Sequence, residues 1–191
     1  FSENCVYILA GILSEPFYHS GAALENMMGS IGAIIGHEIT HAFDASGAKF
    51  DLNGNAADWW TKEDYEAFSD RCAGMKDMFD RFEDAPGIPT SGEQTMSENI
   101  ADLGGLSAGL QVLESKKAQP DYDLFFTSYA DTWRTLHNRQ MVRYLNIADV
   151  HALAWLRTNV PLMQLGQFYD TYGISENDGM YLSPEERISI W

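Results

Sequence analysis

The five residues His37-Glu38-Ile39-Thr40-His41 constrain this chain more than any other stretch of its sequence. Four residues along an α-helix correspond to about 400° of rotation, so side chains at this spacing point the same way. The imidazoles of His37 and His41 can therefore reach one metal ion from one face of a helix. Glu38 lies about 100° around the same helix, where its carboxylate can accept a proton from a metal-bound water.

A pair of histidines in this pattern, H-E-x-x-H, is typical of zinc peptidases, whose metal has three protein ligands and one open position. The third ligand should come from a separate element, and Glu98 is the candidate. Asp102 follows four residues later on the same predicted helix face, where it can accept the free ring N–H of a ligand histidine. Thr95 and Glu98 also fit a capping box, T-x-x-E, and the spacing alone leaves both interpretations open.

The remaining pattern predicts a mainly helical domain. Helices are expected over residues 23–43, 61–82, 97–115, 122–138 and 159–172, with a short one opening at Ser183; residues 5–13 are expected to form a buried strand. Asn159 and Ser183 are predicted to cap their helices. Glycine is unfavourable inside helices, so the stripe of Gly29, Gly32 and Gly36 indicates close approach of another backbone.

Other apolar positions recur at helical spacing and predict the core. The expected helix 61–82 carries the stripe Tyr65, Phe68, Cys72, Met75, Phe79 and Phe82, and the helix 97–115 carries the seam Leu103, Leu106, Leu110 and Leu113. Both patterns indicate helix faces that pack against neighbours. Cys72 is therefore expected to be a buried free thiol. The segment from Asp51 to Asn55 is predicted to be a turn, because the distal glutamate of a calcium loop is replaced by Lys62.

The charge of the chain limits its partners. The sequence has 28 acidic and 12 basic residues, which gives a formal net charge of −16. A charge of this sign argues against binding to nucleic acid or to anionic membrane surfaces. The longest apolar run, residues 5–13, is too short to span a bilayer, so no membrane contact is expected from this segment. Two cysteines do not make a disulfide framework.

Four motifs together resemble one family. GHEITHAFD (36–44), DWW (58–60), ENIAD (98–102) and DVHALAWLR (149–157) stand in the order found in the neprilysin-like (M13) zinc endopeptidases, which include bacterial PepO-type oligopeptidases. Trp191 also resembles the family's usual chain end. The resemblance implies a mainly α, thermolysin-like (gluzincin) catalytic domain with a small N-terminal β element. Residues 1–191 would be the C-terminal catalytic domain of such an enzyme.

The resemblance also implies roles for individual residues. His37, His41 and Glu98 would hold one Zn²⁺ per chain, Glu38 would be the general base that activates a zinc-bound water, and Asp102 would orient a ligand histidine. His151, with Asp149 beside it, would stabilise the oxyanion together with zinc, and Arg157 would hold a substrate carbonyl. Ile12, Phe17, Ile34 and Trp133 would line the pocket for the side chain after the scissile bond. The implied function is hydrolysis of short peptides on the N-terminal side of hydrophobic residues.

The sequence departs from the family pattern in three places. The Asn-Ala-(Tyr/Phe)-Tyr segment expected before residue 5 and the N-terminal helical lid are not in this sequence, so the N-terminal part of the same protein is an expected partner. Leu153 also stands where the family usually has proline. An alternative function is therefore a metal-stabilised structural or interaction fragment without activity of its own. A zinc aminopeptidase would need an anionic site for the substrate amine, for which no motif is visible. The low cysteine count favours a bacterial cytoplasmic or secreted protein over a membrane-anchored ectodomain.

Overall fold

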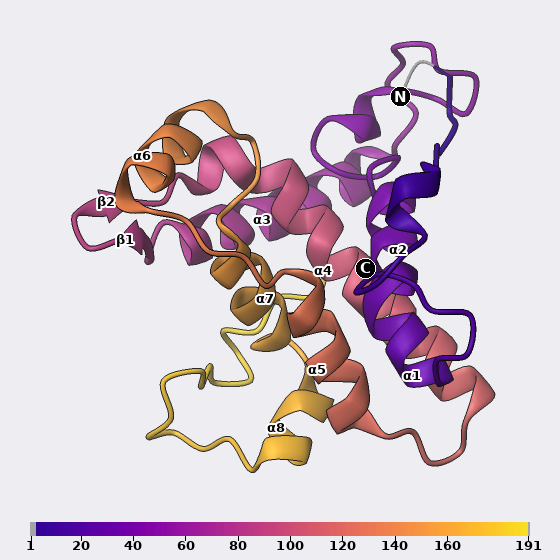
Figure 1. The fold of residues 1–191 in the computed structure, drawn as a ribbon. Coiled ribbons are helices and arrows are strands. Elements are labelled where there is room, and N and C mark those ends of the chain that lie inside the picture. Colours follow the sequence, from indigo (N-terminus) through magenta and orange to yellow (C-terminus); the bar gives the residue numbers. More distant parts are fainter. Residues whose placement is uncertain (1–2, 191) are drawn as a thin grey trace.

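The structure is a computed structural model of the chain and describes residues 3–190, which are mainly helical, as predicted (Figure 1). In chain order the elements are a 3₁₀ turn (Ala10–Ile12), α1 (Leu24–Met27), a π-helical turn (Met28–Gly32), α2 (Ala33–Thr40), a 3₁₀ turn (Gly47–Lys49), α3 (Lys62–Phe79), β1 (Glu83–Ala85), β2 (Ile88–Pro89), α4 (Gly92–Lys116), α5 (Tyr122–Thr132), α6 (Arg139–Ala148), α7 (Ala154–Leu162) and α8 (Gly166–Tyr172). The strands β1 and β2 pair as an antiparallel hairpin.

The helix that carries the two histidines runs from α1 through the π-helical turn into α2 and packs along α4 (Figure 1). A Cβ atom on Gly36 would lie 2.9 Å from the Gly105 Cα atom, and one on Gly105 would lie 2.3 Å from the Ala33 carbonyl oxygen. The two helices therefore touch backbone to backbone, which confirms the predicted close approach. Gly29 likewise faces the Phe125 carbonyl oxygen of α5, whereas Gly32 faces only its own helix.

The central helix α4 separates two hydrophobic clusters. Its predicted seam of Leu103, Leu106, Leu110 and Leu113 is buried, as expected. Leu103 belongs to a cluster shared with α3 and α7, and the other three leucines pack with α5 and α8. A third, smaller cluster of Ile88, Val142 and Leu153 joins the hairpin, α6 and the start of α7. The site described below lies where these layers meet.

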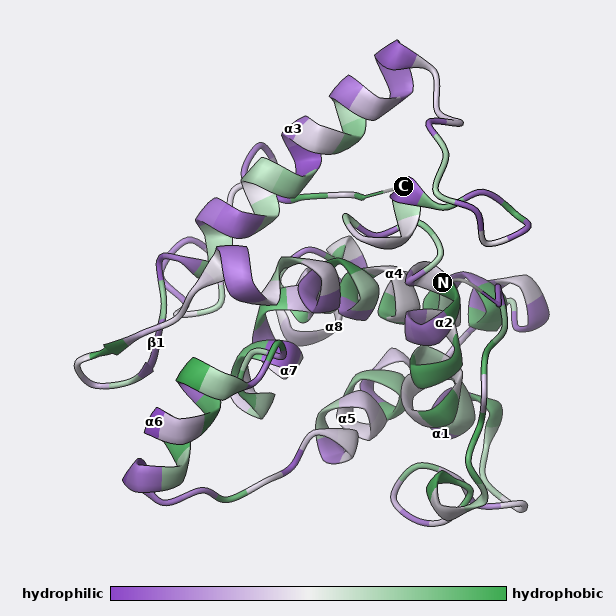
Figure 2. Cartoon of the chain, turned by 90° about the horizontal axis from the view of Figure 1, so that it is seen from above, coloured by the Kyte–Doolittle hydropathy of each residue, from purple (hydrophilic) through white to green (hydrophobic). Residues whose placement is uncertain are grey.

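The C-terminal part of α3 packs against α4 and α7, whereas its N-terminal turns project into solvent. Figure 2 shows its first turns reaching away from the other helices, with hydrophilic residues along them. Of the predicted stripe, the residues from Phe68 to Phe79 are buried, whereas Tyr65 is exposed and Phe82 follows the helix end. Cys72 is a buried free thiol, as predicted, and burial raises its pKa to about 11.

The predicted N-terminal strand is not formed. Residues 5–9 are exposed and form no regular secondary structure, and Ala10–Ile12 form a 3₁₀ turn. A strand needs a neighbour for its N–H and C=O groups, and residues 3–190 supply none beside this segment. Trp191, cited for its resemblance to the family's chain end, lies outside the described residues.

Several helix boundaries also differ from the predictions, and the expected helix 159–172 is divided into α7 and α8. The expected helix 122–138 ends at Thr132, and Asn138 caps a separate helix, α6, by accepting a hydrogen bond from the Met141 N–H. Asn159 is not a cap, because α7 already begins at Ala154. Pro161 fits inside α7 because the Arg157 carbonyl, which its missing N–H leaves free, accepts from the Tyr129 hydroxyl at 2.9 Å.

The expected final helix at Ser183 is only a turn. The Glu186 carboxylate accepts from the Ser183 N–H, as in a capping box, but the chain does not continue as a helix. The segment 51–55 is a turn, as predicted: the Asp51 carboxylate accepts from the N–H groups of Asn53 and Asn55. Within residues 3–190, no helix combines the length and apolar character needed to cross a membrane.

Candidate metal centre

His37 and His41 point into the same space, as their spacing predicts. Their Nε2 atoms lie 3.1 Å apart, and their rings meet edge to face at 85°. His37 is buried between α2 and α4, and His41 lies at the C-terminal end of α2 and is half-buried. The backbone contact at Gly36 and Gly105 brings α4 within reach of both rings.

Glu98, one of the residues on α4, completes the group. Its Oε2 atom lies 3.2 Å from His37 Nε2 and 3.3 Å from His41 Nε2. The same oxygen is buried and has no hydrogen bond of acceptable geometry. The capping-box interpretation of Glu98 is wrong, because α4 begins at Gly92 and its cap is Ser91, which accepts from the Gln94 N–H.

The Nδ1 atoms of His37 and His41, which face away from Glu98, contact two carboxylates, and these contacts fix the direction of the Nε2 atoms. His37 Nδ1 lies 2.8 Å from Asp102 Oδ1, and His41 Nδ1 lies 2.6 Å from Asp44 Oδ2. Both carboxylates are almost completely buried. A carboxylate accepts, so in the neutral rings the proton sits on Nδ1 and the Nε2 lone pairs face Glu98.

Three lone-pair atoms facing one another repel unless a metal ion or a proton lies between them. Ligand atoms of a tetrahedral zinc site with bonds of about 2.0–2.1 Å are roughly 3.3 Å apart. The three separations between His37, His41 and Glu98, 3.1 to 3.3 Å, are close to that value. The donor set of two imidazoles and one carboxylate therefore fits zinc, and each imidazole has the carboxylate partner that zinc-binding histidines usually have.

Without a cation, the ionisable groups of the centre perturb one another strongly. Burial lowers the pKa of His41, but its contacts with Asp44 and Glu98 outweigh this and raise it to about 10. Burial raises the pKa of Glu98, yet the contacts with His151, His37 and His41 bring it far below its usual range. A negative oxygen surrounded by ring nitrogens is a site that attracts positive charge.

His151 approaches the same oxygen from the loop between α6 and α7. Its Nε2 atom lies 3.1 Å from Glu98 Oε2, and its Nδ1 atom lies 2.8 Å from Asp149 Oδ1. His37, Glu98 and His151 thus form a second possible donor set, with ligand atoms within 4.8 Å of one another. His151 is more exposed than His41, and its carboxylate partner is half-buried rather than buried.

Arg157 lies behind the centre. Its Nε and Nη2 atoms donate to the two oxygens of Asp102, each at 2.8 Å, and its guanidinium lies 3.8 Å from the centroid of the Trp133 ring. Burial raises the pKa of Asp102, but the Arg157 charge outweighs this and holds it below its usual value. The ionised carboxylate is the form that accepts from His37.

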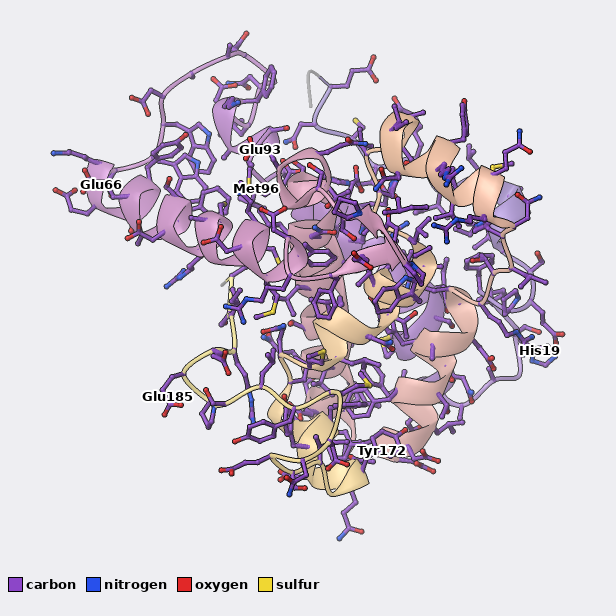
Figure 3. All side chains as sticks on the ribbon, turned by 90° about the vertical axis from the view of Figure 1, so that its left-hand side faces the viewer. His19, Glu66, Glu93, Met96, Tyr172 and Glu185 are labelled. Atoms are coloured by element: carbon purple, nitrogen blue, oxygen red, sulfur yellow. The ribbon has the colours of Figure 1, made fainter. Side chains whose placement is uncertain are left out.

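A cleft of about 990 Å³ opens on the metal side of these residues. Its wall consists of residues 4–7, 38–39, 41–46, 49, 93–94, 96–98 and 150. Glu38 is exposed in this cleft, beside His41 and Glu98. Figure 3 labels Glu93 and Met96, which lie together at the start of α4 and belong to the same wall, and His19, which lies at a distant edge. His19 and His137 are exposed and take no part in the centre.

The four residues predicted to line a hydrophobic pocket do not line this cleft. Ile34 is buried on α2, Ile12 is half-buried in the first 3₁₀ turn, and Phe17 accepts at its carbonyl from the Ile31 N–H. Trp133 packs under Arg157. Their shared pocket stays a prediction.

Two side chains near the centre were not found from the sequence. Asp44 both supports His41 and ends the helix: its Oδ2 atom lies 2.6 Å from His41 Nδ1, and its Oδ1 atom accepts from the N–H groups of Ser46 and Gly47. Gln94 donates from Nε2 to the carbonyl oxygens of Asn146 and Asp149. Its position four residues before Glu98 was the available signal, because residues at this spacing share a helix face.

Two histidines of one helix and a glutamate of a second, in a mainly helical domain, define the thermolysin-like (gluzincin) class of metallopeptidase domains. Residues 1–188 match the sequence model of one protein family, Peptidase family M13. The chain belongs to this family.

Individual relatives agree with the assignment. The chain is 42% identical over 189 residues to the neutral endopeptidase of Lactococcus lactis subsp. lactis (strain IL1403), covering 99% of this chain and 30% of the relative. It is 30% identical to neprilysin of Mus musculus, covering 99% of this chain and 27% of the relative. The chain thus spans less than a third of the length of these relatives.

Solved structures give the same fold. The crystal structure of PepO from Lactobacillus rhamnosis HN001 superposes with a TM-score of 0.89 at 38% identity, covering 95% of this chain and 29% of that one. The zinc metalloprotease Zmp1 of Mycobacterium tuberculosis, in complex with an inhibitor, gives a TM-score of 0.91 at 33% identity, covering 95% of this chain and 30% of that one.

Proposed function

We propose that this chain is the catalytic part of a zinc-dependent endopeptidase that hydrolyses short peptides, on the N-terminal side of hydrophobic residues. The observation that carries the proposal is the convergence of His37 Nε2, His41 Nε2 and Glu98 Oε2, with both Nδ1 atoms held by buried carboxylates. Family membership and the neutral endopeptidase and zinc metalloprotease relatives support it.

One zinc ion per chain would be held by His37, His41 and Glu98. We choose this set over His37, Glu98 and His151 because His41 sits on a helix and its partner Asp44 is fully buried. Bound there, zinc supplies a Lewis acid that polarises the scissile carbonyl and lowers the pKa of water. Asp102 and Asp44 keep the two imidazoles in the tautomer that binds a metal.

Glu38 and His151 would carry the proton transfer and the charge stabilisation. Glu38, exposed in the cleft, accepts a proton from the attacking water and delivers it to the leaving nitrogen. The contact with Glu98 raises the pKa of His151, burial opposes this, and Asp149 adds to the rise. The imidazolium form can donate from Nε2 to the developing oxyanion while its Nδ1–H stays on Asp149.

The remaining predicted residues would hold the substrate. Arg157 uses Nε and Nη2 on Asp102, and we assign its Nη1 to a substrate carbonyl. Ile12, Phe17, Ile34 and Trp133 would accept the hydrophobic side chain after the scissile bond. An N-terminal part of the same protein would enclose the cleft, as the family resemblance implies.

The test is cleavage of a peptide blocked at both ends by the intact protein and by its Glu38→Gln variant. We expect turnover to fall by about 10²- to 10⁴-fold, because a general base contributes that much, while the zinc content stays at one per chain. Equal and negligible turnover of the two proteins would contradict the proposal and favour a metal-stabilised structural or interaction domain.

The blocked peptide also tests the direction of attack. An aminopeptidase would leave it intact, whereas an endopeptidase cleaves it internally. Mass spectrometry of the products should place the new N-termini at hydrophobic residues. Cleavage before charged residues at equal rates would refute the proposed pocket of Ile12, Phe17, Ile34 and Trp133.

A further inference from the structure

The loop that carries Asp149 and His151 is held differently from the rest of the centre. Both side chains are half-buried, and they contact each other: Asp149 Oδ1 accepts from the His151 N–H at 3.0 Å and lies 2.8 Å from His151 Nδ1. A pair bonded to itself fixes its internal geometry but not its place over Glu98. Ala152 and Leu153 are buried and hold the end of the loop that leads into α7, whereas residues 147–150 are not buried and need a separate anchor.

Gln94 is such an anchor. Its Nε2 atom donates to the Asn146 carbonyl at 3.2 Å and to the Asp149 carbonyl. Both partners are carbonyl oxygens, so the amide end that faces them must be the NH₂ group. The Asn146 carbonyl lies in the last turn of α6, where carbonyls lack partners within the helix. Gln94 therefore gives a hydrogen-bond donor to one carbonyl at the end of α6 and to the carbonyl of the first residue after it.

The same helix face connects this anchor to the metal centre. Gln94, Glu98 and Asp102 are spaced by four residues each on α4 and share one face. Gln94 contacts the loop that carries His151, and Glu98 contacts the Nε2 atoms of His37 and His41. Asp102 contacts the Nδ1 atom of His37. One rigid helix thus sets the distance between the loop and the centre.

The loop is supported from the other side by the hairpin. The Asn146 side chain donates from Nδ2 to Asp84 Oδ2 and to the Pro89 carbonyl, each at 2.8 Å. Beneath these contacts, Val142 of α6 packs with Ile88 and Leu153. The hairpin fixes α6, and Gln94 fixes the loop that leaves it.

We propose that Gln94 is a positioning residue that holds His151 at the distance from Glu98 required for its role in turnover. The inference rests on the role of His151 in the proposed function. Gln94 contacts none of the proposed zinc ligands through its side chain, so its effect should appear in turnover and in loop mobility rather than in zinc affinity. A displacement of a catalytic group by about 1 Å can cost about 10²-fold in rate.

Three variants separate positioning from a general structural role. Gln94→Met keeps the length of the side chain and removes the donor, whereas Gln94→Lys keeps a donor for the carbonyls. The control, Gln167→Met, removes a side-chain hydrogen bond of 2.9 Å from α8 to Glu114, which lies at the opposite end of α4 from Gln94. The intact protein and each variant are compared in kcat, KM, zinc affinity and melting temperature.

We expect Gln94→Met to lower kcat by about 10- to 100-fold, with KM and zinc affinity within about threefold of the wild type. Gln94→Lys should recover most of kcat, and Gln167→Met should match the wild type. An unchanged kcat in Gln94→Met would overturn the inference, as would equal losses in the Met and Lys variants or a loss explained by KM.

Amide hydrogen exchange tests the anchor without any activity. Losing two hydrogen bonds should speed exchange over residues 147–153 by about 5- to 100-fold in Gln94→Met, in zinc-free protein as well. Exchange at the wild-type rate overturns the anchor even if every protein cleaves peptides. Faster exchange in proteins that cleave no peptide leaves the anchor standing and contradicts the proposed function instead.

Discussion

Two regions bring histidines to the centre, and they are built in different ways. His37 and His41 stand on α2, which touches α4 backbone to backbone, and their Nδ1 atoms contact buried carboxylates. His151 stands on a loop held by polar contacts from Gln94 and by its half-buried partner Asp149. Under the proposed function, this difference would assign metal retention and turnover to separate parts of the fold.

The first region has little freedom to adjust. Its helices meet through backbone atoms, so a change there must move a helix, and with it a proposed zinc ligand. In the second region Ala152 and Leu153 are buried, but Asp149, Val150 and His151 are not, so this part of the loop can move without moving either helix of the pair. Variants in the helix pair should therefore alter zinc binding and stability, whereas variants in the loop should alter turnover.

The largest expected effect is that of Glu98→Ala. Removing one of three protein ligands should weaken zinc binding by more than about 10³-fold, beyond the 10- to 100-fold typical of partners that only orient a ligand. Competition with a chelating dye measures the affinity. Glu93→Ala, on the exposed surface of the same cleft, is the matched control and should keep zinc. Wild-type affinity in Glu98→Ala would remove this residue from the centre.

Gly105→Ala tests the contact between the two helices. The added methyl group would meet the Ala33 carbonyl oxygen at 2.3 Å and the His37 nitrogen at 2.5 Å, which are backbone atoms. Overpacking of this kind costs about 1–3 kcal/mol, and a rigid backbone favours the upper end. We expect the melting temperature to fall by roughly 6–12 °C.

The control for this substitution is Gly166→Ala, because a Cβ atom there meets nothing within 4 Å. It should change the melting temperature little. Equal melting temperatures of Gly105→Ala and the wild type would mean that α2 and α4 can move apart at little cost, which would contradict a rigid contact between their backbones.

Asp102→Asn tests the carboxylate that contacts the Nδ1 atom of His37. The amide can still contact His37, but it can present its NH₂ group to the ring and it leaves the Arg157 charge without its partner. Zinc affinity should fall by about 10- to 100-fold. Titration with zinc by calorimetry measures it, and an unchanged affinity would mean that Asp102 does not orient His37.

The smallest expected effect concerns an ion pair at the start of the histidine helix. Glu25 is buried, and both of its oxygens accept from Lys117, at 2.6 and 2.7 Å. The contact with Lys117 lowers the pKa of Glu25 below its usual 4.5, although burial opposes this. A lowered pKa in the folded state stabilises the protein above the unfolded-state value and loses that contribution as the pH falls.

Glu25→Gln should therefore lower the free energy of unfolding by about 1 kcal/mol at pH 7, and the difference from the wild type should shrink below about pH 4. Urea unfolding at pH 7 and pH 3.5 compares the two proteins. The zinc affinity should stay unchanged, because the pair lies at the far end of the helix. If the difference in the free energy of unfolding between the two proteins grew towards low pH, the ion pair would not be what stabilises the fold at pH 7.

The sequence predicted the first region better than the second. Periodicity is a local signal, so the helix bearing His37 and His41, the seam of α4 and the close approach at Gly36 could all be predicted. Asp102 could be placed because it shares a helix face with Glu98. These features depend on spacing within one helix, which the sequence records directly.

The second region depends on contacts between distant segments. The contact of Gln94 with the loop depends on where the hairpin and α6 place that loop. The helix α6 is itself amphipathic, with Val142 and Leu145 packed toward the hairpin, so its pattern was present in the sequence and was missed. The strand expected over residues 5–13 is not formed, because an apolar run specifies burial only if a partner is present. His151 was found through family resemblance rather than spacing.

Zinc affinity in His41→Ala and His151→Ala tests the central claim most directly. Both imidazoles reach Glu98 Oε2, at 3.3 and 3.1 Å, yet only His41 belongs to the helix pair. We predict that His41→Ala loses zinc, with an affinity weakened by more than about 10³-fold, whereas His151→Ala keeps one zinc ion and loses turnover by about 10²- to 10³-fold. Loss of zinc in His151→Ala and its retention in His41→Ala would contradict the account.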